Sequence, residues 1–240
     1  MHTLEANHLV KTIKKAKLVH NISLNIKTKE VVGLLGPNGA GKTTTFYMIC
    51  GLATTTDGNV LLDGKDITDL PLSSRAKLGI GYLPQESSIF KDLTVEENLQ
   101  IAGEALGLDE STMKERIEKL LEVFNIEPIR NREGIRLSGG ERRRVEIARS
   151  LMGKPKFLLL DEPFAGVDPI AVLDIQNIIK QLIELDMGIL ITDHNVRETL
   201  GICDRAYVMR SGEMLANGTS EEIIANEDVK KYYLGENFSF

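Results

Sequence analysis

The sequence contains few cysteines, no long apolar run and no excess of basic residues, and each absence excludes a class of protein. Its 2 cysteines, Cys50 and Cys203, stand alone without metal-ligand spacing, which predicts two small buried apolar residues in a reducing compartment. No apolar run approaches the ~20 residues needed to cross a bilayer, and the N-terminal stretch lacks the apolar segment of a signal peptide. We therefore expect a cytoplasmic chain that acts at a membrane only through partners.

The charge balance argues against a role in binding nucleic acid. The formal net charge is −6, whereas a dedicated nucleic-acid-binding protein usually presents a basic footprint. The basic run 142–144 is interpreted as solvated or interdomain pairing residues, because three consecutive arginines on a helix point in different directions. Nucleic acid is therefore not among the predicted partners.

The order of strand and helix patterns predicts one α/β domain, residues 1–240. With 42% hydrophobic residues, the chain can bury a sizeable core without disulfides. In the second predicted strand, alternation predicts that Leu18, Ile22, Leu24 and Ile26 share one face. Strands are predicted at 4–10, 18–26, 31–35, 59–62, 79–83, 157–161 and 189–192, with a hairpin at 205–209 and 213–217.

Three helix patterns in succession interrupt this alternation of strands and helices. Thr94 and Glu97 form a capping box, Asp109 caps a second helix with an apolar stripe, and a third helix follows residues 137–140. We therefore expect a helical lobe at 86–155 inserted between two parts of a sheet core, 1–85 and 156–240. Further helices are predicted at 42–51, 71–78, 170–186, 195–202, 221–225 and 229–234.

The stretch 36–43 reads GPNGAGKT and matches the phosphate-binding pattern G-x-x-x-x-G-K-[ST] between a predicted strand and a predicted helix. Its glycines leave backbone amides free to surround anionic oxygens at a helix N-terminus. Lys42 directs a charge toward the β- and γ-phosphates, and the hydroxyl of Thr43 suits Mg²⁺. The predicted nucleotide-binding residues of this stretch are Gly36, Pro37, Asn38, Gly39, Ala40, Gly41, Lys42, Thr43 and Thr44.

A second apolar strand, 157–161, ends in Asp161 and is followed by Glu162. A buried strand that ends in an acid at the carboxyl edge of a parallel sheet places that acid beside the phosphate-binding loop. Asp161 is therefore predicted to support Mg²⁺, and Glu162 to act as general base on a water aligned with the γ-phosphate.

The stretch 137–141, LSGGE, opens the third helix of the predicted lobe. Ser138 at the cap and Gly139 and Gly140 after it leave backbone amides exposed at the positive end of a helix, which suits a second phosphate site. A well-capped helix without a ligand explains the same residues. Together with the loop 36–43, however, the stretch suggests that two chains packed head to tail bind one ATP from opposite sides.

These motifs, in this order and over nearly the whole chain, resemble those of the ATP-binding cassette (ABC) ATPases. The Walker A loop is 36–43, the Q-loop glutamine is Gln85, the signature is 137–141, Walker B is 157–161, the D-loop is 165–168 and the switch histidine is His194. The resemblance implies the P-loop NTPase fold, with a RecA-like sheet core, an antiparallel β subdomain and an inserted helical lobe. It also implies an ATPase that uses ATP and Mg²⁺.

The resemblance assigns roles to single residues. It implies a homodimer with ATP sandwiched between subunits, in which Ser138, Gly139, Gly140 and Asp168 of one chain face the nucleotide of the other. Many members stack an aromatic residue on adenine, and Ile13 takes that place here. The implied catalytic residues are Glu162, His194 and Lys42, and the implied Mg²⁺ residues are Thr43, Gln85 and Asp161.

Within this family, the amino-acid sequences of residues 79–99, 138–151 and 158–172 resemble those of the ATPases of lipopolysaccharide exporters. That resemblance implies lipopolysaccharide extraction from the inner membrane toward the outer membrane, powered from the cytoplasmic face through two transmembrane permease subunits. The alternatives are the ATPase of a branched-chain amino-acid importer and a soluble single-cassette protein of the iron–sulfur assembly type.

The permease subunits are expected to dock near Gln85, Phe90 and Leu93, although core packing in the lobe explains the last two equally. The tail 234–240 is expected to steady the homodimer or to fray.

Overall fold

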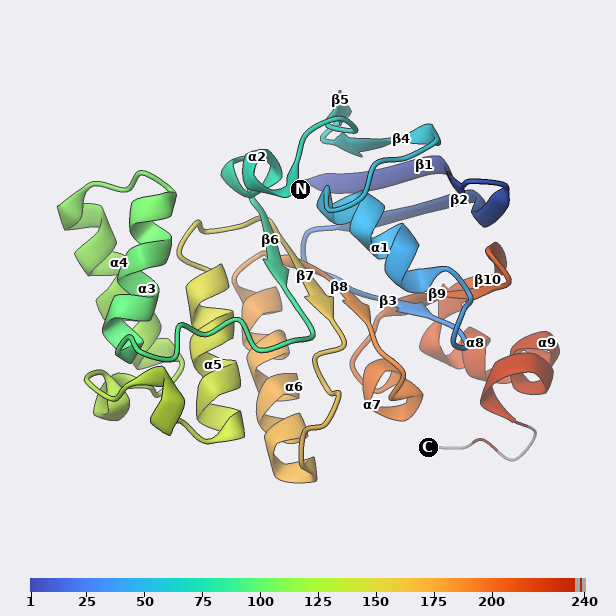
Figure 1. Ribbon diagram of the computed structural model, residues 1–240. Coiled ribbons are helices and arrows are strands. Elements are labelled where there is room, and N and C mark those ends of the chain that lie inside the picture. The colour runs from blue at the N-terminus through green and yellow to red at the C-terminus, as the bar shows by residue number, and fades with distance from the viewer. Residues whose placement is uncertain (236–237, 239–240) are drawn as a thin grey trace.

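The computed structural model describes residues 1–235 and 238, and Figure 1 shows two β-sheets with helices around them. The strands among these residues are β1 (Thr3–Ile13), β2 (Ala16–Lys27), β3 (Val31–Leu35), β4 (Asp57–Leu62), β5 (Lys65–Asp66), β6 (Ile80–Leu83), β7 (Phe157–Asp161), β8 (Gly188–Thr192), β9 (Arg205–Arg210) and β10 (Glu213–Thr219). The α-helices are α1 (Lys42–Cys50), α2 (Leu72–Lys77), α3 (Val95–Ala105), α4 (Glu110–Val123), α5 (Gly139–Ser150), α6 (Pro169–Glu184), α7 (Val196–Leu200), α8 (Ser220–Ala225) and α9 (Glu227–Val229).

The larger sheet has the strand order β10-β9-β3-β8-β7-β6. Its pairs are parallel except for the antiparallel hairpin of β9 and β10. Strands β3, β7 and β8 are buried along their whole length, which agrees with their continuous apolar sequences, because parallel strands are usually covered on both faces. The carboxyl ends of these strands meet at one edge of the sheet, and this edge carries the candidate site.

The smaller sheet is antiparallel with the order β2-β1-β4-β5. Ile22, Leu24 and Ile26 of β2 are buried as predicted, but the prediction for Leu18 is wrong, because Leu18 is 38% exposed and Val19 is fully buried instead. Asn21 has a positive φ of 63°, and the register of β1 against β2 shifts in this region. Such a bulge changes the phase of the side-chain alternation, so the buried face moves by one residue.

Helix α3 packs against α4 and α5, and α5 also contacts edge strand β6. The three helices lie away from the antiparallel sheet (Figure 1). Their N-terminal ends are capped as the sequence predicts: Thr94 and Glu97 form a capping box on α3, and Asp109 accepts a hydrogen bond from the amide of Thr112 on α4. The predicted apolar stripe of α4 is directed inward, with Ile117 buried in the core. The boundaries predicted for the lobe, at 85 and 155, stay predictions.

The C-terminal part departs from the sequence prediction in detail. The predicted helix 195–202 is shortened to α7, and the helix predicted at 229–234 is divided between α9 and a π-type turn, Lys230–Leu234. Gly235, with a φ of 87°, ends that turn. Most of the tail predicted to steady a dimer, at residues 236–237 and 239–240, lies outside the described residues. Phe238 is described, and its ring lies 6.0 Å from the guanidinium of Arg197.

Both cysteines are free and buried, as predicted. Burial raises the pKa of the Cys50 thiol and of the Cys203 thiol, because the charged form loses its solvation. Within residues 1–235 and 238, the structure contains no helix with the length and apolar character needed to span a bilayer.

Candidate functional site

The phosphate-binding loop leaves strand β3 and enters helix α1 through a backbone that needs glycine. Gly36 has a φ of 141° and Gly41 a φ of 97°, which residues with side chains rarely adopt. A Cβ on Gly36 would lie 2.1 Å from the carbonyl oxygen of Met209, so the loop is pressed against β9. Gly39, in contrast, faces open space within 4 Å. The loop is therefore held against β9 at Gly36 and is open at Gly39.

Lys42, the first residue of α1, is buried inside this loop. Its Nζ donates hydrogen bonds to the carbonyl oxygens of Gly36 at 2.7 Å and Pro37 at 3.1 Å. Burial lowers the pKa of Lys42, while the nearby carboxylates of Glu162 and Asp193 act in the opposite direction. A cation held by two carbonyl oxygens can exchange them for the oxygens of an anion of high charge.

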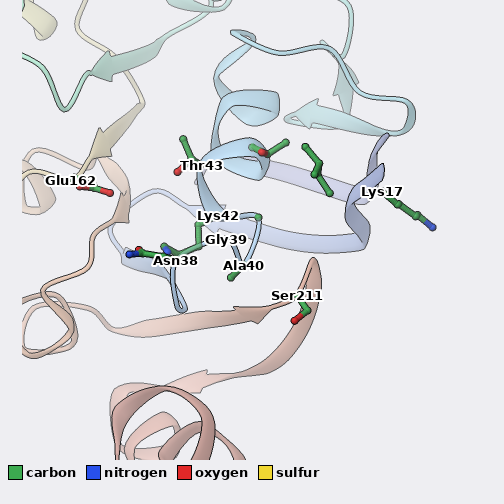
Figure 2. Close-up of a pocket in the computed structure, with 11 residues that line it drawn as sticks. Lys17, Asn38, Gly39, Ala40, Lys42, Thr43, Glu162 and Ser211 are labelled. Carbon is green, nitrogen blue, oxygen red and sulfur yellow. The ribbon is translucent and has the colours of Figure 1, made fainter. Parts of the chain in front are cut away.

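The loop forms one wall of a cavity of about 520 Å³, shown in Figure 2. Sequence reasoning missed Lys17 and Leu18 from β2 and Ser211 from the β9–β10 turn, which line this cavity together with the loop. The amide of His20 donates to Gly212 at 2.7 Å, and this contact brings β2 and that turn together. The lining residues are Lys17, Leu18, Asn38, Gly39, Ala40, Gly41, Lys42, Thr43, Thr44, Glu162 and Ser211.

Ile13, predicted to contact the base, is not among these lining residues of the described chain. It ends β1 just before the tight turn at Lys14, whose φ is 56°, and its side chain is 51% exposed. The structure therefore does not bring Ile13 into the cavity, and its role in base selection stays a prediction. The available signal for the contact of Ser211 was the hairpin predicted at 205–209 and 213–217, whose turn contains this residue.

Asp161 and Glu162 occupy the end of β7 in very different environments. Asp161 is 3% exposed, and burial raises its pKa, although hydrogen bonds from Tyr47 and Tyr82 act to lower it. Glu162 has a φ of 45°, a conformation that is strained for a residue with a side chain, and its amide donates to the carbonyl of Thr192 at 2.7 Å. The strained turn directs the Glu162 side chain into the cavity, where Figure 2 shows it facing the loop.

Gln85 and His194 converge on Glu162 from separate elements. Gln85 follows β6, and its Nε2 donates to Oε2 of Glu162 at 2.7 Å. His194 follows β8, and its Nδ1 lies 3.2 Å from the same oxygen. One carboxylate oxygen is thus held between an amide and an imidazole, which is suitable for orienting a general base.

Gly139 and Gly140 of the signature line a second, smaller cavity of about 190 Å³, together with Gln85, Glu162 and Asp168. Ser138 caps α5 by accepting a hydrogen bond from the amide of Glu141, and Asp168 caps α6 in the same manner. Among the described residues, the two signature glycines, Ser138 and Asp168 do not line the larger cavity of the same chain. The phosphate-binding loop and the signature glycines therefore line different cavities of one subunit, and Glu162 is common to both cavities.

The segment after Gln85 is held by the signature helix. The guanidinium of Arg149 lies 5.2 Å from the centroid of the Phe90 ring, which is 46% exposed. Leu93 is only partly buried. Exposure of Phe90 leaves it available for contact with another protein, and the docking role of both residues stays a prediction.

The run of arginines after the signature pairs within the chain, in agreement with the pairing interpretation. Arg143 is buried, donates to the carbonyl of Pro84 and forms an ion pair with Glu146. Arg144 lies 3.4 Å from Asp174 of α6. These contacts join helix α5 to neighbouring elements.

Comparisons with known proteins agree with this geometry. The sequence profile of the ABC transporter family matches residues 19–165. The chain is 55% identical to the lipopolysaccharide export system ATP-binding protein LptB of Haemophilus influenzae over 99% of each chain, and 54% identical to LptB of Escherichia coli K12 over the same shares.

Solved structures of this family have the same fold. A crystal structure of an ATP-binding cassette of an ABC transporter in its ADP conformation superposes with a TM-score of 0.88 at 30% identity, covering 98% of this chain and 100% of that chain. The predicted fold class is thereby confirmed. With more than half of its residues matched by the family profile and with full-length relatives above half identity, the chain belongs to the ABC transporter family.

Proposed function

We propose that the chain is the ATP-hydrolysing subunit of an ABC exporter that powers the transport of lipopolysaccharide. The observation that carries the ATPase assignment is the convergence of Gln85 and His194 on Glu162, opposite a buried Lys42 in the phosphate-binding loop. The cargo follows from the lipopolysaccharide export relatives, which match the chain at 50–55% identity over nearly its whole length.

In this mechanism the loop amides and Lys42 hold the β- and γ-phosphates at the N-terminus of α1. Glu162 accepts a proton from the attacking water, and Gln85 and His194 keep its carboxylate in place. In the present structure Lys42 is bound by the carbonyls of Gly36 and Pro37, so nucleotide phosphate replaces these partners when it binds.

The donor set fits Mg²⁺. The hydroxyl of Thr43, the side-chain amide of Gln85 and the carboxylate of Asp161 offer the oxygen ligands that this ion prefers, and Asp161 is buried at the edge of the site. When bound, the ion neutralises charge that develops on the transferred phosphoryl group. These three residues are the ones we propose to hold or support it.

The separation of the two phosphate sites supports a homodimer. In one subunit Gly139 and Gly140 line a different cavity from the phosphate-binding loop. Two subunits that pack head to tail bring the capped N-terminus of α5 to the partner's nucleotide, where exposed amides favour an anion. Asp168, at the start of α6, belongs to the same surface.

Coupling to transport requires membrane partners. We propose that two transmembrane permease subunits contact the surface near Gln85, Phe90 and Leu93, which places the ATPase on the cytoplasmic face of the inner membrane. Exposure of Phe90 and the link from Gln85 to Glu162 support this position, since a contact there is sensitive to the state of the catalytic site. An amino-acid importer ATPase and an iron–sulfur assembly cassette are less well supported, because the full-length relatives are of the lipopolysaccharide export type.

The decisive experiment replaces Glu162 by Gln in the full chain. A lost general base lowers turnover by about 10²–10⁴-fold, while ATP affinity changes little, because the loop and Lys42 remain. Turnover is measured by phosphate release, and affinity by equilibrium binding. Near-normal hydrolysis by this variant refutes the catalytic assignment, and co-purification with subunits of an importer instead of an exporter refutes the cargo assignment.

A further inference from the structure

Three segments that carry the proposed Mg²⁺ residues also contribute to one polar cluster beneath the site. Asp161 ends β7, Tyr82 lies on β6 three residues before Gln85, and Tyr47 lies on α1 four residues after Thr43. The hydroxyl of Tyr82 donates to Oδ2 of Asp161 at 3.5 Å. The hydroxyl of Tyr47 interacts with both Asp161 and Tyr82, and these two interactions shift the pKa of Tyr47 in opposite directions.

Apolar and aromatic side chains surround this cluster. The Tyr82 ring lies 6.2 Å from the Phe46 ring, and both tyrosines pack against the core between the two sheets. Burial raises the pKa of both phenols, so they remain protonated hydrogen-bond donors at neutral pH. A buried carboxylate needs such donors, because an unpaired charge away from water is costly.

We propose that Tyr47 and Tyr82 are positioning residues for the Mg²⁺ site: their hydroxyls orient the Asp161 carboxylate and tie together the segments that carry Thr43 and Gln85. This inference rests on the proposed function of Asp161. Groups that orient a metal ligand from behind typically change metal affinity by about 10–100-fold when they are removed. Neither tyrosine is placed in contact with the nucleotide, because neither lines the cavity of the phosphate-binding loop in the described chain.

The test compares Tyr47→Phe, Tyr82→Phe and the double variant with the unmodified full-length protein. Phenylalanine keeps the ring and its packing and removes only the hydroxyl. Tyr207→Phe is the matched control, because the Tyr207 side chain is buried, its hydroxyl accepts hydrogen bonds from Arg205 and from the amide of Asn25, and it does not line the cavity of the phosphate-binding loop in the described chain. Binding of a fluorescent ATP analogue is measured in EDTA and then across a Mg²⁺ titration, with thermal unfolding as a check on folding.

We expect the double variant to bind the analogue in EDTA within twofold of the unmodified protein and to need about 10-fold more Mg²⁺ for half-maximal effect. Each single variant should need a smaller increase in Mg²⁺ concentration, and the control variant should need no increase. An unchanged Mg²⁺ requirement in the double variant overturns the inference. An equal loss of affinity with and without Mg²⁺ also overturns it, because that pattern indicates a role in packing alone. If the double variant does not fold, the two single variants decide by the same criteria.

The experiment also separates this inference from the proposed function. Asp161→Asn serves as the reference, and it should weaken the Mg²⁺ response more than either tyrosine variant. If the unmodified protein and Asp161→Asn respond identically to Mg²⁺, the proposed metal role of Asp161 is wrong. If Asp161→Asn weakens the response and the tyrosine variants do not, only the positioning role is refuted.

Discussion

Arg75 provides a sharp test of how the phosphate-binding helix is held. Its side chain is fully buried, and its guanidinium donates to four backbone carbonyls: Leu70 at 2.8 Å, Met48 at 2.8 Å, Ile49 at 2.5 Å and Thr68 at 2.7 Å. Two of these carbonyls belong to the last turn of α1. A cation at this position also complements the negative end of the helix.

Replacing Arg75 by Met keeps much of the volume and removes every donor. The carbonyl of Met48 retains a hydrogen bond from the amide of Gly51, but the guanidinium's other partners lose a charged donor in a buried environment. Each lost hydrogen bond lowers the free energy of unfolding by about 1–3 kcal/mol, whereas removing the buried charge recovers its desolvation penalty. We therefore expect the free energy of unfolding to fall by about 3–5 kcal/mol in total. For a domain of this size that is a fall in Tm of roughly 10 °C.

The assay is urea unfolding followed by circular dichroism, with Arg136→Met as the control, because the Arg136 side chain is 73% exposed. The control should change stability by less than about 0.5 kcal/mol. If Arg75→Met also stays within about 1 kcal/mol of the unmodified protein, the reasoning about these four carbonyls is refuted.

Three further predictions concern the site itself. Burial raises the pKa of the Asp161 carboxyl group above its usual value of 3.8. The folded state therefore binds the carboxyl proton more tightly than the unfolded state does. As a result, the free energy of unfolding falls as the pH rises from 3.8 through the pKa of the folded state. Asp161→Asn should therefore reduce this fall, measured by denaturant unfolding between pH 4 and 7, and an unchanged profile contradicts the burial argument. Gly36→Ala should abolish nucleotide binding or folding, since its Cβ meets the Met209 carbonyl at 2.1 Å, and normal equilibrium binding of ATP disproves this. Ser138→Ala should lower ATP turnover and also lower the free energy of unfolding by about 1 kcal/mol, because it removes the cap of α5. Ser138→Asn should restore the stability of the cap but not the turnover. Equal turnover in the unmodified protein and both variants argues against the dimeric site.

Local chemistry was sufficient to predict much of this molecule. Strand β3 and helix α1 were predicted because an apolar run, a glycine-rich loop and helical spacing follow one another in a short stretch, and each depends only on near neighbours. The cap of α3 was predicted for the same reason, since Thr94 and Glu97 bond to backbone within a single turn. The fold class and the family followed from these motifs and their order.

Contacts between distant segments were decided only by the tertiary structure. The bulge at Asn21 moved the buried position from Leu18 to Val19, because register depends on the partner strand and not on alternation alone. The β9–β10 turn carried Ser211 to the phosphate-binding loop. The sequence patterns single out neither Tyr47 nor Tyr82. These residues become partners of Asp161 only where α1, β6 and β7 meet, because interactions between side chains depend on distances that no local pattern encodes.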